Sequence, residues 1–216
     1  NRLLGAEEGR IVLGGKRRRG FTLIELVTAI ALLAILMVVG VPAFGTYLQN
    51  ARLRGAAENF YGGVQMARAE AVRRNTTVQI VLTSDPGVDS SANTDNLSPT
   101  GPNWIIRAQR PGSTFFDFVE GQTMTEGSAE QTGGTPSVAI VGSVGGVPLS
   151  SVGFSGLGAA SSLAGPASFD FTNPNGGGCA ADGGPMRCLR VVVSVGGPAR
   201  LCDPSVTTAG DTRACS

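Results

Sequence analysis

The side chains that could do chemistry in this chain are few, and their types exclude most enzyme mechanisms. The 216 residues include 17 Lys and Arg, 16 Asp and Glu and 4 Cys, but no histidine. The chain therefore has no imidazole general base, no Ser-His or Cys-His pair and no histidine metal ligand. Serine and threonine are common, but nothing in the sequence activates one as a nucleophile. We expect no catalytic residue, no metal site and no cofactor.

One carboxylate lies within the longest apolar run. The run Leu23–Phe44 follows a basic cluster, Lys16–Arg19, and contains a single charged residue, Glu25. A helix of this length, at about 1.5 Å per residue, covers a hydrocarbon core of roughly 30 Å. We therefore expect residues 21–44 to span a membrane, with the basic cluster on the cytoplasmic side. Glu25 then needs either a partner or a place near the helix N-terminus, where the helix dipole and headgroup water tolerate a carboxylate.

The residues around this carboxylate resemble the class III signal of type IV pilins and type II secretion pseudopilins. Gly20 is followed by Phe21-Thr22-Leu23-Ile24-Glu25-Leu26 and then by the apolar run. In that family a membrane peptidase cuts after the glycine, the new N-terminal aromatic residue is methylated, and the glutamate pairs with the amino terminus of a neighbouring subunit. The resemblance implies that Gly20 is the cleavage position, Phe21 the methylated terminus and Glu25 the assembly carboxylate. Residues 1–20 would be a basic leader peptide.

The residues after the apolar run predict an amphipathic second half of the same helix, residues 45–75. Apolar residues recur three or four positions apart, which is typical of one buried helix face. These are Leu53, Ala57, Phe60, Val64, Ala67 and Ala71. Asn75 and Thr76 would end the helix, and the apolar period changes to two at Val78, which predicts a strand over 78–82. This junction resembles that of the GspH/FimT subfamily of minor pilins.

The rest of the chain predicts a β-rich domain, residues 76–216. Residues 84–103 are rich in Asp, Ser, Asn, Pro and Gly and predict a long exposed loop. Further strands are expected at 104–110, 114–119, 138–141, 168–172 and 189–195. The expected fold class is α+β and pilin-like: a long N-terminal helix, membrane-spanning in its first half, packs through its second half on a C-terminal antiparallel β-sheet domain.

The four cysteines lie close together near the end of the chain. They are Cys179, Cys188, Cys202 and Cys215. This part of the chain is expected to be exported across the membrane into an oxidising compartment. An even number of cysteines there predicts disulfides, for which three pairings are possible. We favour Cys179–Cys188 and Cys202–Cys215, because each closes a loop with Gly or Pro and both leave 189–195 and 199–202 able to pair as a hairpin. A metal site is the alternative, and the lack of histidine and of CxxC spacing argues against it.

Four arginines accompany these cysteines. Arg187, Arg190, Arg200 and Arg213 lie within the same C-terminal segment. Some members of the FimT branch bind DNA through a Gly-Arg-x-Arg element just before a cysteine. The segment Gly197-Pro198-Ala199-Arg200-Leu201-Cys202 keeps the glycine and the second arginine but has Pro198 at the first. A DNA-binding role for the four arginines is thus one hypothesis, and ordinary surface arginines on a disulfide-tied hairpin are the other.

Three functions follow from the resemblance. We favour a structural minor pilin that takes part in type IV pilus assembly at or near the tip, since the disulfide-bearing tail resembles the pilus branch more. The alternatives are a minor pseudopilin of a type II protein secretion system and a DNA-binding minor pilin for natural transformation. The implied partners are the prepilin peptidase/methylase, other minor and major pilins or pseudopilins, the inner membrane and, for the third function, DNA. The implied localisation is a single pass through the bacterial inner membrane with a periplasmic C-terminal domain, followed by a pilus or pseudopilus filament.

Overall fold

The computed structural model describes residues 20–124, 138–161 and 163–215, and within these ranges it describes only the backbone of residues 38–43. The chain divides into two compact units, residues 1–42 and 43–216. The expected leader peptide lies outside the described residues, apart from Gly20. The expected strand at 138–141 falls at the start of the second described range.

The long helix α1, Leu23–Arg74, begins in the first unit and ends in the second. The helix ends before Asn75 because this residue has a left-handed backbone conformation, with a φ of 49°. The backbone N–H of Thr76 donates to the carbonyl of Ala71 and that of Asn75 to Val72, each at 3.3 Å. This is a Schellman motif, in which a left-handed residue satisfies the last carbonyls of the helix. The helix end expected at Asn75 is confirmed.

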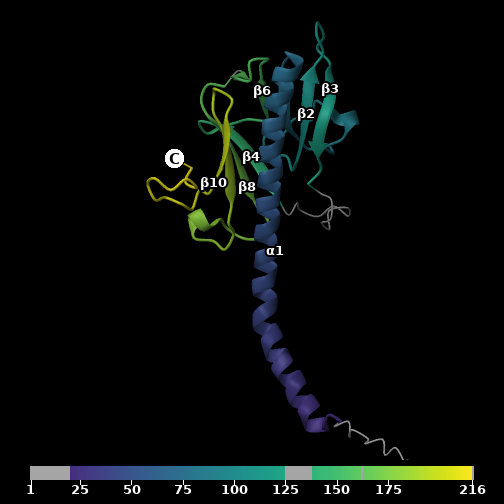
Figure 1. Ribbon diagram of the computed structural model, residues 1–216, viewed down its shortest axis with the longest axis vertical. Helices are drawn as coiled ribbons and strands as arrows, with labels where there is room; N and C mark the ends of the chain where they lie inside the picture. Colours follow the sequence, from purple (N-terminus) through teal and green to yellow (C-terminus); the bar gives the residue numbers. More distant parts are fainter. Residues whose placement is uncertain (1–19, 125–137, 162, 216) are drawn as a thin grey trace, which may run out of the picture. The chain divides into compact units, whose positions relative to one another are not determined.

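The described residues of the second unit form ten strands in two antiparallel sheets (Figure 1). The first sheet has the order β3-β2-β1-β6-β7 and the second β10-β9-β8-β4-β5. In chain order the bounds are β1 Val78–Thr83, β2 Asn103–Gln109, β3 Phe116–Gln122, β4 Ala139–Val144, β5 Val147–Pro148, β6 Ser151–Phe154, β7 Ala160–Ser161, β8 Ala167–Thr172, β9 Leu189–Val193 and β10 Ala199–Cys202. Short 3-10 turns occur at η1, Asp89–Ser91, and η3, Ala180–Asp182. The α+β class with an antiparallel β domain is confirmed, and the structure divides that domain into two sheets.

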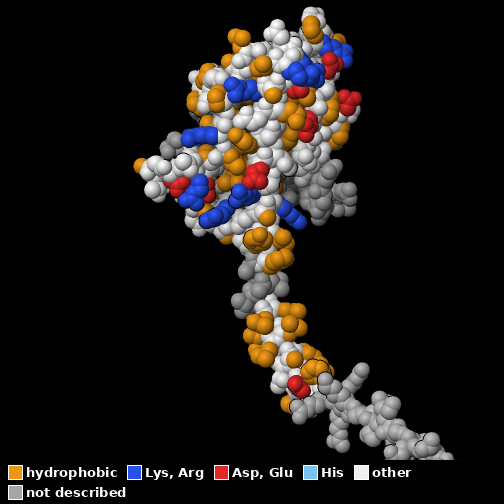
Figure 2. Space-filling view, viewed as in Figure 1, with side chains coloured by type: hydrophobic (Ala, Val, Ile, Leu, Met, Phe, Trp, Pro, Cys, Tyr) orange, Lys and Arg blue, Asp and Glu red, His pale blue; other side chains and the backbone are white. Residues whose placement is uncertain are grey.

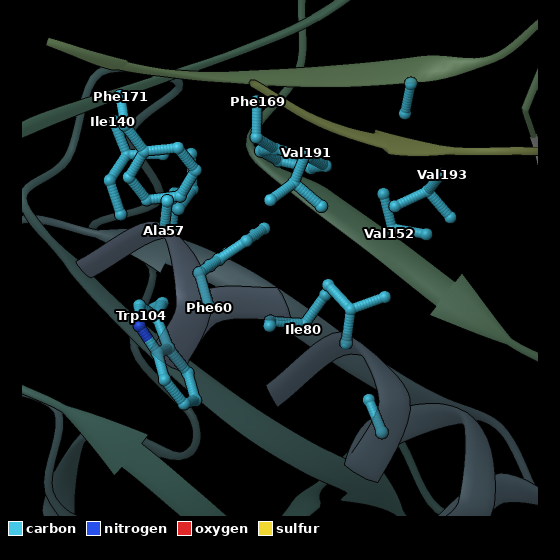
Figure 3. Close-up of a cluster of buried hydrophobic side chains, with 14 of the residues drawn as sticks. Ala57, Phe60, Ile80, Trp104, Ile140, Val152, Phe169, Phe171, Val191 and Val193 are labelled. Carbon is cyan, nitrogen blue, oxygen red and sulfur yellow. The ribbon is translucent and has the colours of Figure 1, made fainter. Parts of the chain in front are cut away.

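The two sheets share one core, which α1 fills from its apolar stripe. Every residue of the stripe is fully buried: Leu53, Ala57, Phe60, Val64, Ala67 and Ala71. Phe60 contacts both sheets, because its ring centroid lies 6.1 Å from that of Trp104 on β2 and 4.8 Å from that of Phe169 on β8. Figure 3 shows Phe60 between Trp104 on one side and Phe169 and Val191 on the other. The predicted helix face is confirmed, and Phe60 on that face contacts both sheets.

Close packing at this junction explains one glycine of α1. A Cβ atom at Gly63 would lie 2.8 Å from the ring of Trp104, closer than carbon atoms pack. The Trp104 ring therefore lies directly on the helix backbone. Packing at this spacing requires glycine at position 63.

The segment before β2 is largely the exposed loop that the sequence predicts, and a few of its residues are buried. Residues 84–102 fold over the outer face of the first sheet, where Val81, Ala92 and Ile105 are buried outside the main core. Arg107 on β2 holds the loop in place, because its Nη1 donates to the Ala92 carbonyl at 3.2 Å. The Arg107 guanidinium also lies 4.1 Å from the centroid of the Phe116 ring on β3. The composition of this loop predicts its turns and its exposure, and the second apolar face beneath the loop accounts for the burial of Ser91 and Ala92.

The strand bounds need correction. The strand expected at 114–119 is observed as β3, Phe116–Gln122, and the strands β5, β6 and β7 were not expected. These strands are only two to four residues long, too short for an alternating pattern to identify them in sequence. Among the residues that the structure describes, no helix is long and apolar enough to cross a membrane. The span expected at residues 21–44 stays a prediction.

Candidate assembly site and C-terminal arginines

The start of α1 is held by a reciprocal pair of hydrogen bonds between Thr22 and Glu25. The Glu25 backbone N–H donates to Thr22 Oγ1 at 3.3 Å, and the Thr22 backbone N–H donates to Glu25 Oε2 at 3.4 Å. This arrangement is a capping box, in which the side chains at the cap and three positions later satisfy each other's backbone donors. This role of Thr22 was not expected from the sequence, although the Thr-x-x-Glu spacing before an apolar run is the usual signal of a capping box.

The capping box places the Glu25 carboxylate at the positive end of the helix dipole. Glu25 is exposed, and it shares this end of α1 with Gly20 and with Phe21, which is 85% exposed. A carboxylate in the first turn is stabilised by the helix dipole, and it keeps lone pairs free to accept from a cation. The site can therefore accept a hydrogen bond from an external amine without losing its cap.

The four cysteines form two disulfides, Cys179–Cys188 and Cys202–Cys215. These are the sequential pairs that the sequence favours. The loop closed by Cys179–Cys188 lies against α1, because the Arg187 backbone N–H donates to Asn50 Oδ1 at 2.7 Å. The second disulfide closes the C-terminal tail onto β10, on which Cys202 lies.

Three of the four C-terminal arginines bind acceptors of the chain itself. Arg190 forms an ion pair with Asp170 on the adjacent strand β8, with Nε–Oδ1 at 2.7 Å. Arg200 Nη2 donates to the Cys215 carbonyl at 2.7 Å. Arg213 pairs with Asp211, and its hydrogen bonds lower the pKa of that carboxyl to about 2.

Three of the four arginines lie around strands β9 and β10. Arg190 and Arg200 are on the same face of these adjacent strands, because Arg200 pairs with Val192 and Cys202 pairs with Arg190. Arg213 lies in the tail that the second disulfide closes onto β10, and its carbonyl accepts from the Asp203 N–H at 2.7 Å. Arg187 instead lies beside α1. The DNA-binding role stays a prediction.

No metal cluster is present in the described ranges: no three His, Cys, Asp or Glu side chains there could hold one metal ion. The Glu25 carboxylate and the arginine guanidiniums can each bind a group of opposite charge.

Comparison with known families gives two successive matches along the chain. Residues 15–41 match the prokaryotic N-terminal methylation motif, and residues 56–197 match the family described as type II transport protein GspH. A curated relative, prepilin peptidase-dependent protein D of Escherichia coli K12, is 29% identical over 117 residues, which cover 54% of this chain. The alignment spans 64% of that protein, less than two thirds of its length.

Several solved structures are similar at low sequence identity. The type IV minor pilin FimU of Pseudomonas aeruginosa is 16% identical with a TM-score of 0.47, and the match covers 72% of this chain and 91% of FimU. The minor pseudopilin EpsH from the type 2 secretion system of Vibrio cholerae is 12% identical with a TM-score of 0.46, and covers 72% of this chain and 99% of EpsH.

The assignment rests on the order and extent of the two family matches. The methylation motif contains Gly20, Phe21 and Glu25, and the GspH match begins within α1 and ends in the turn after β9. The GspH match alone covers more than half of the 216 residues. The chain therefore belongs to the GspH family of type II transport proteins and carries the N-terminal methylation motif of prokaryotic pilin-like proteins.

Proposed function

We propose that the chain is a structural, non-enzymatic minor subunit that takes part in the assembly of a type IV pilus or of a type II secretion pseudopilus. The observation that carries the proposal is the succession of the methylation motif, residues 15–41, and the GspH domain, residues 56–197, along one helix-led chain. The pilus and pseudopilus assignments are equally supported by membership of this family. A prepilin peptidase and other pilins or pseudopilins are the partners.

In this proposal α1 has two successive roles. Its first half anchors the subunit in the inner membrane, with the second unit in the periplasm. Cleavage between Gly20 and Phe21 frees the amino group of Phe21, which is then methylated. The exposed carboxylate of Glu25 pairs with the amino terminus of a neighbouring subunit, where a medium of low dielectric strengthens the attraction.

The processing step is tested by the intact mass of the chain extracted from membranes. We expect a mass that begins at methylated Phe21. A chain that retains Lys16–Arg19, or one cut after the apolar run, would contradict the proposal.

The assembly role of Glu25 is tested by three substitutions at that position. Glu25→Ala removes both the cap and the charge, whereas Glu25→Gln keeps a side-chain oxygen for the cap and removes only the charge. We expect both variants to insert into the membrane and to be depleted from purified filaments, because the lost ion pair leaves the neighbouring amine unpaired. Glu25→Asp tests whether the reach of the carboxylate matters.

The Glu25→Gln variant decides between the two effects of this side chain. If Glu25→Gln enters filaments as well as the wild type while Glu25→Ala does not, assembly depends on the helix cap, and the proposed ion pair with the neighbouring amino terminus is refuted. Glu58→Gln, on an exposed face of α1, is the matched control and should enter filaments normally. Deletion of the gene separates the two systems, since loss of pili identifies a pilus subunit and loss of protein export identifies a pseudopilin.

A further inference from the structure

Two arginines of the described part of the chain have no side-chain partner within it. All the other described arginines donate to an acceptor: Arg54, Arg68, Arg73, Arg74, Arg107, Arg110, Arg190, Arg200 and Arg213. The exceptions are Arg52 on α1 and Arg187 in the loop closed by Cys179–Cys188, and both are exposed. A cation left without an internal partner is available to an external anion.

The two unpartnered arginines lie at nearly the same height along α1. The Arg187 backbone is fixed to Asn50 by its 2.7 Å hydrogen bond, and Arg52 follows Asn50 by two residues. Two residues rise about 3 Å along a helix and turn roughly 200° around it. Arg52 and Arg187 therefore flank α1 on different sides at one level. Figure 2 shows arginine side chains gathered there, around the first turns of α1 in the second unit.

Two aromatic residues just before this level are exposed. Phe44 is 63% exposed and Tyr47 is 68% exposed, and Phe44 ends the apolar run. Aromatic side chains of this kind collect at the boundary between hydrocarbon and headgroups. From Phe44 to Arg52 the helix rises about 12 Å, and a headgroup layer is roughly 5–7 Å thick on each side. A long arginine side chain can bend back over the remaining distance, as it does at membrane interfaces.

Charge around the two arginines favours an anionic partner. Glu58, the nearest acid on α1, is already paired with Arg54 at 2.8 Å. Asp182 lies in the same disulfide-closed loop as Arg187, and the structure contains no ion pair between them. A partner in a groove would contact one side of α1, whereas a membrane surface surrounds the helix at a single level. The placement of the arginines matches the second geometry.

We propose that Arg52 and Arg187 bind the phosphate groups of anionic phospholipids on the periplasmic surface of the inner membrane. The contact holds the second unit at the membrane before the subunit enters a filament. The Cys179–Cys188 disulfide takes part indirectly, because it fixes the loop that brings Arg187 to α1. This inference rests on the membrane anchoring in the proposed function.

The test uses the full chain reconstituted in phosphatidylcholine vesicles that contain a trace of spin-labelled lipid. Electron paramagnetic resonance gives the preference of the protein for labelled phosphatidylglycerol over labelled phosphatidylcholine. Because each arginine near a membrane surface contributes about a fivefold preference for anionic lipid, we expect a several-fold preference in the wild type. Arg52→Gln and Arg187→Gln should each lower it, and the double variant should bring the ratio close to one.

Matched controls separate the arginines of interest from arginines in general. Arg54→Gln alters a neighbouring arginine that is already paired with Glu58, and Arg213→Gln alters one in the C-terminal tail. Both should leave the lipid preference nearly unchanged. Equal thermal midpoints of wild type and double variant would show that the substitutions act on lipid binding and not on folding.

Several results would overturn the proposal. A wild type without lipid preference, or a double variant that keeps it, would show that the arginines do not select anionic lipid. Abolition of the preference by inorganic phosphate at constant ionic strength would show that the site takes any phosphate. Binding of duplex DNA through the same two arginines, without lipid preference, would identify DNA as the partner. A chain that carbonate extracts from membranes would refute the anchoring as well, whereas an inserted chain without preference would refute only this inference.

Discussion

Replacing Phe60 should cost more stability than any other single truncation on the helix stripe. Phe60 is the largest side chain of the stripe, it is fully buried, and its ring lies within 6.1 Å of Trp104 and 4.8 Å of Phe169, centroid to centroid. It also lies 5.5 Å from Phe171. The side chain therefore connects α1 to both sheets, and Phe60→Ala removes all three contacts at once.

The expected loss can be worked out from burial and cavity volume. Burying a Phe side chain contributes about 1.5–3 kcal/mol. The truncation leaves a cavity on the order of 100 Å³, which at about 24 cal/mol per Å³ costs about 2.4 kcal/mol more. The two terms give about 4–5 kcal/mol, within the usual range for Phe→Ala in a core. For a unit of this size, that loss lowers the melting temperature by about 8–20 °C.

The assay is urea unfolding of the detergent-solubilised chain, followed by the near-ultraviolet signal of Trp104. Phe115→Ala is the matched control, since Phe115 is 60% exposed and its truncation should change the free energy of unfolding by no more than about 0.5 kcal/mol. If Phe60→Ala costs less than about 1 kcal/mol with an unchanged slope against urea, the two sheets do not share a core through this ring, and the packing argument is wrong.

Three further predictions concern charge, covalent links and the tail. Hydrogen bonds from Arg73 and Arg74 lower the pKa of Glu70 from 4.5 to about 2. The ionised Glu70 therefore contributes roughly 1 kcal/mol to the free energy of unfolding, a small amount because the arginines are partly exposed; this contribution is complete above pH 4.5 and is lost as the pH falls toward 2. The free energy of unfolding of Glu70→Gln, measured across this pH range, should lack this pH-dependent contribution. Replacing Cys202 and Cys215 together by serine should lower the free energy of unfolding by about 3 kcal/mol through the loop they close, and an unchanged denaturation midpoint would contradict this. Any DNA binding should be weak, independent of sequence and reduced by salt; Arg200→Ala should weaken it most and Pro198→Arg should strengthen it in a mobility shift at low salt, and no change in either variant would leave Arg200 as a surface residue.

The features that the sequence predicted correctly are those encoded over short distances along the chain. The buried stripe of α1 follows a 3.6-residue period, and the helix end follows from Asn75, which tolerates a positive φ. The favoured disulfides join cysteines 9 and 13 positions apart, with loops that local turn residues allow. The Thr22–Glu25 capping box was equally local and could have been found from its spacing.

The features that only the tertiary structure decided depend on contacts between distant segments. The division into two sheets follows from pairings such as β1 with β6, and the short strands β6 and β7 have too few β-forming residues to signal those pairings in sequence. Ser91 and Ala92 of the loop at 84–102 are buried because a second apolar face lies beneath them. A period of two identifies the alternate faces of a strand without telling which segment covers each face. Arg187 and Asn50 meet across 137 residues. The amino-acid sequence by itself therefore determined the signal segment, the helix and the cysteine pairs. The core shared by the two sheets, and the level at which Arg52 and Arg187 flank α1, were decided by the tertiary structure, because such contacts depend on distant partners that no local pattern specifies.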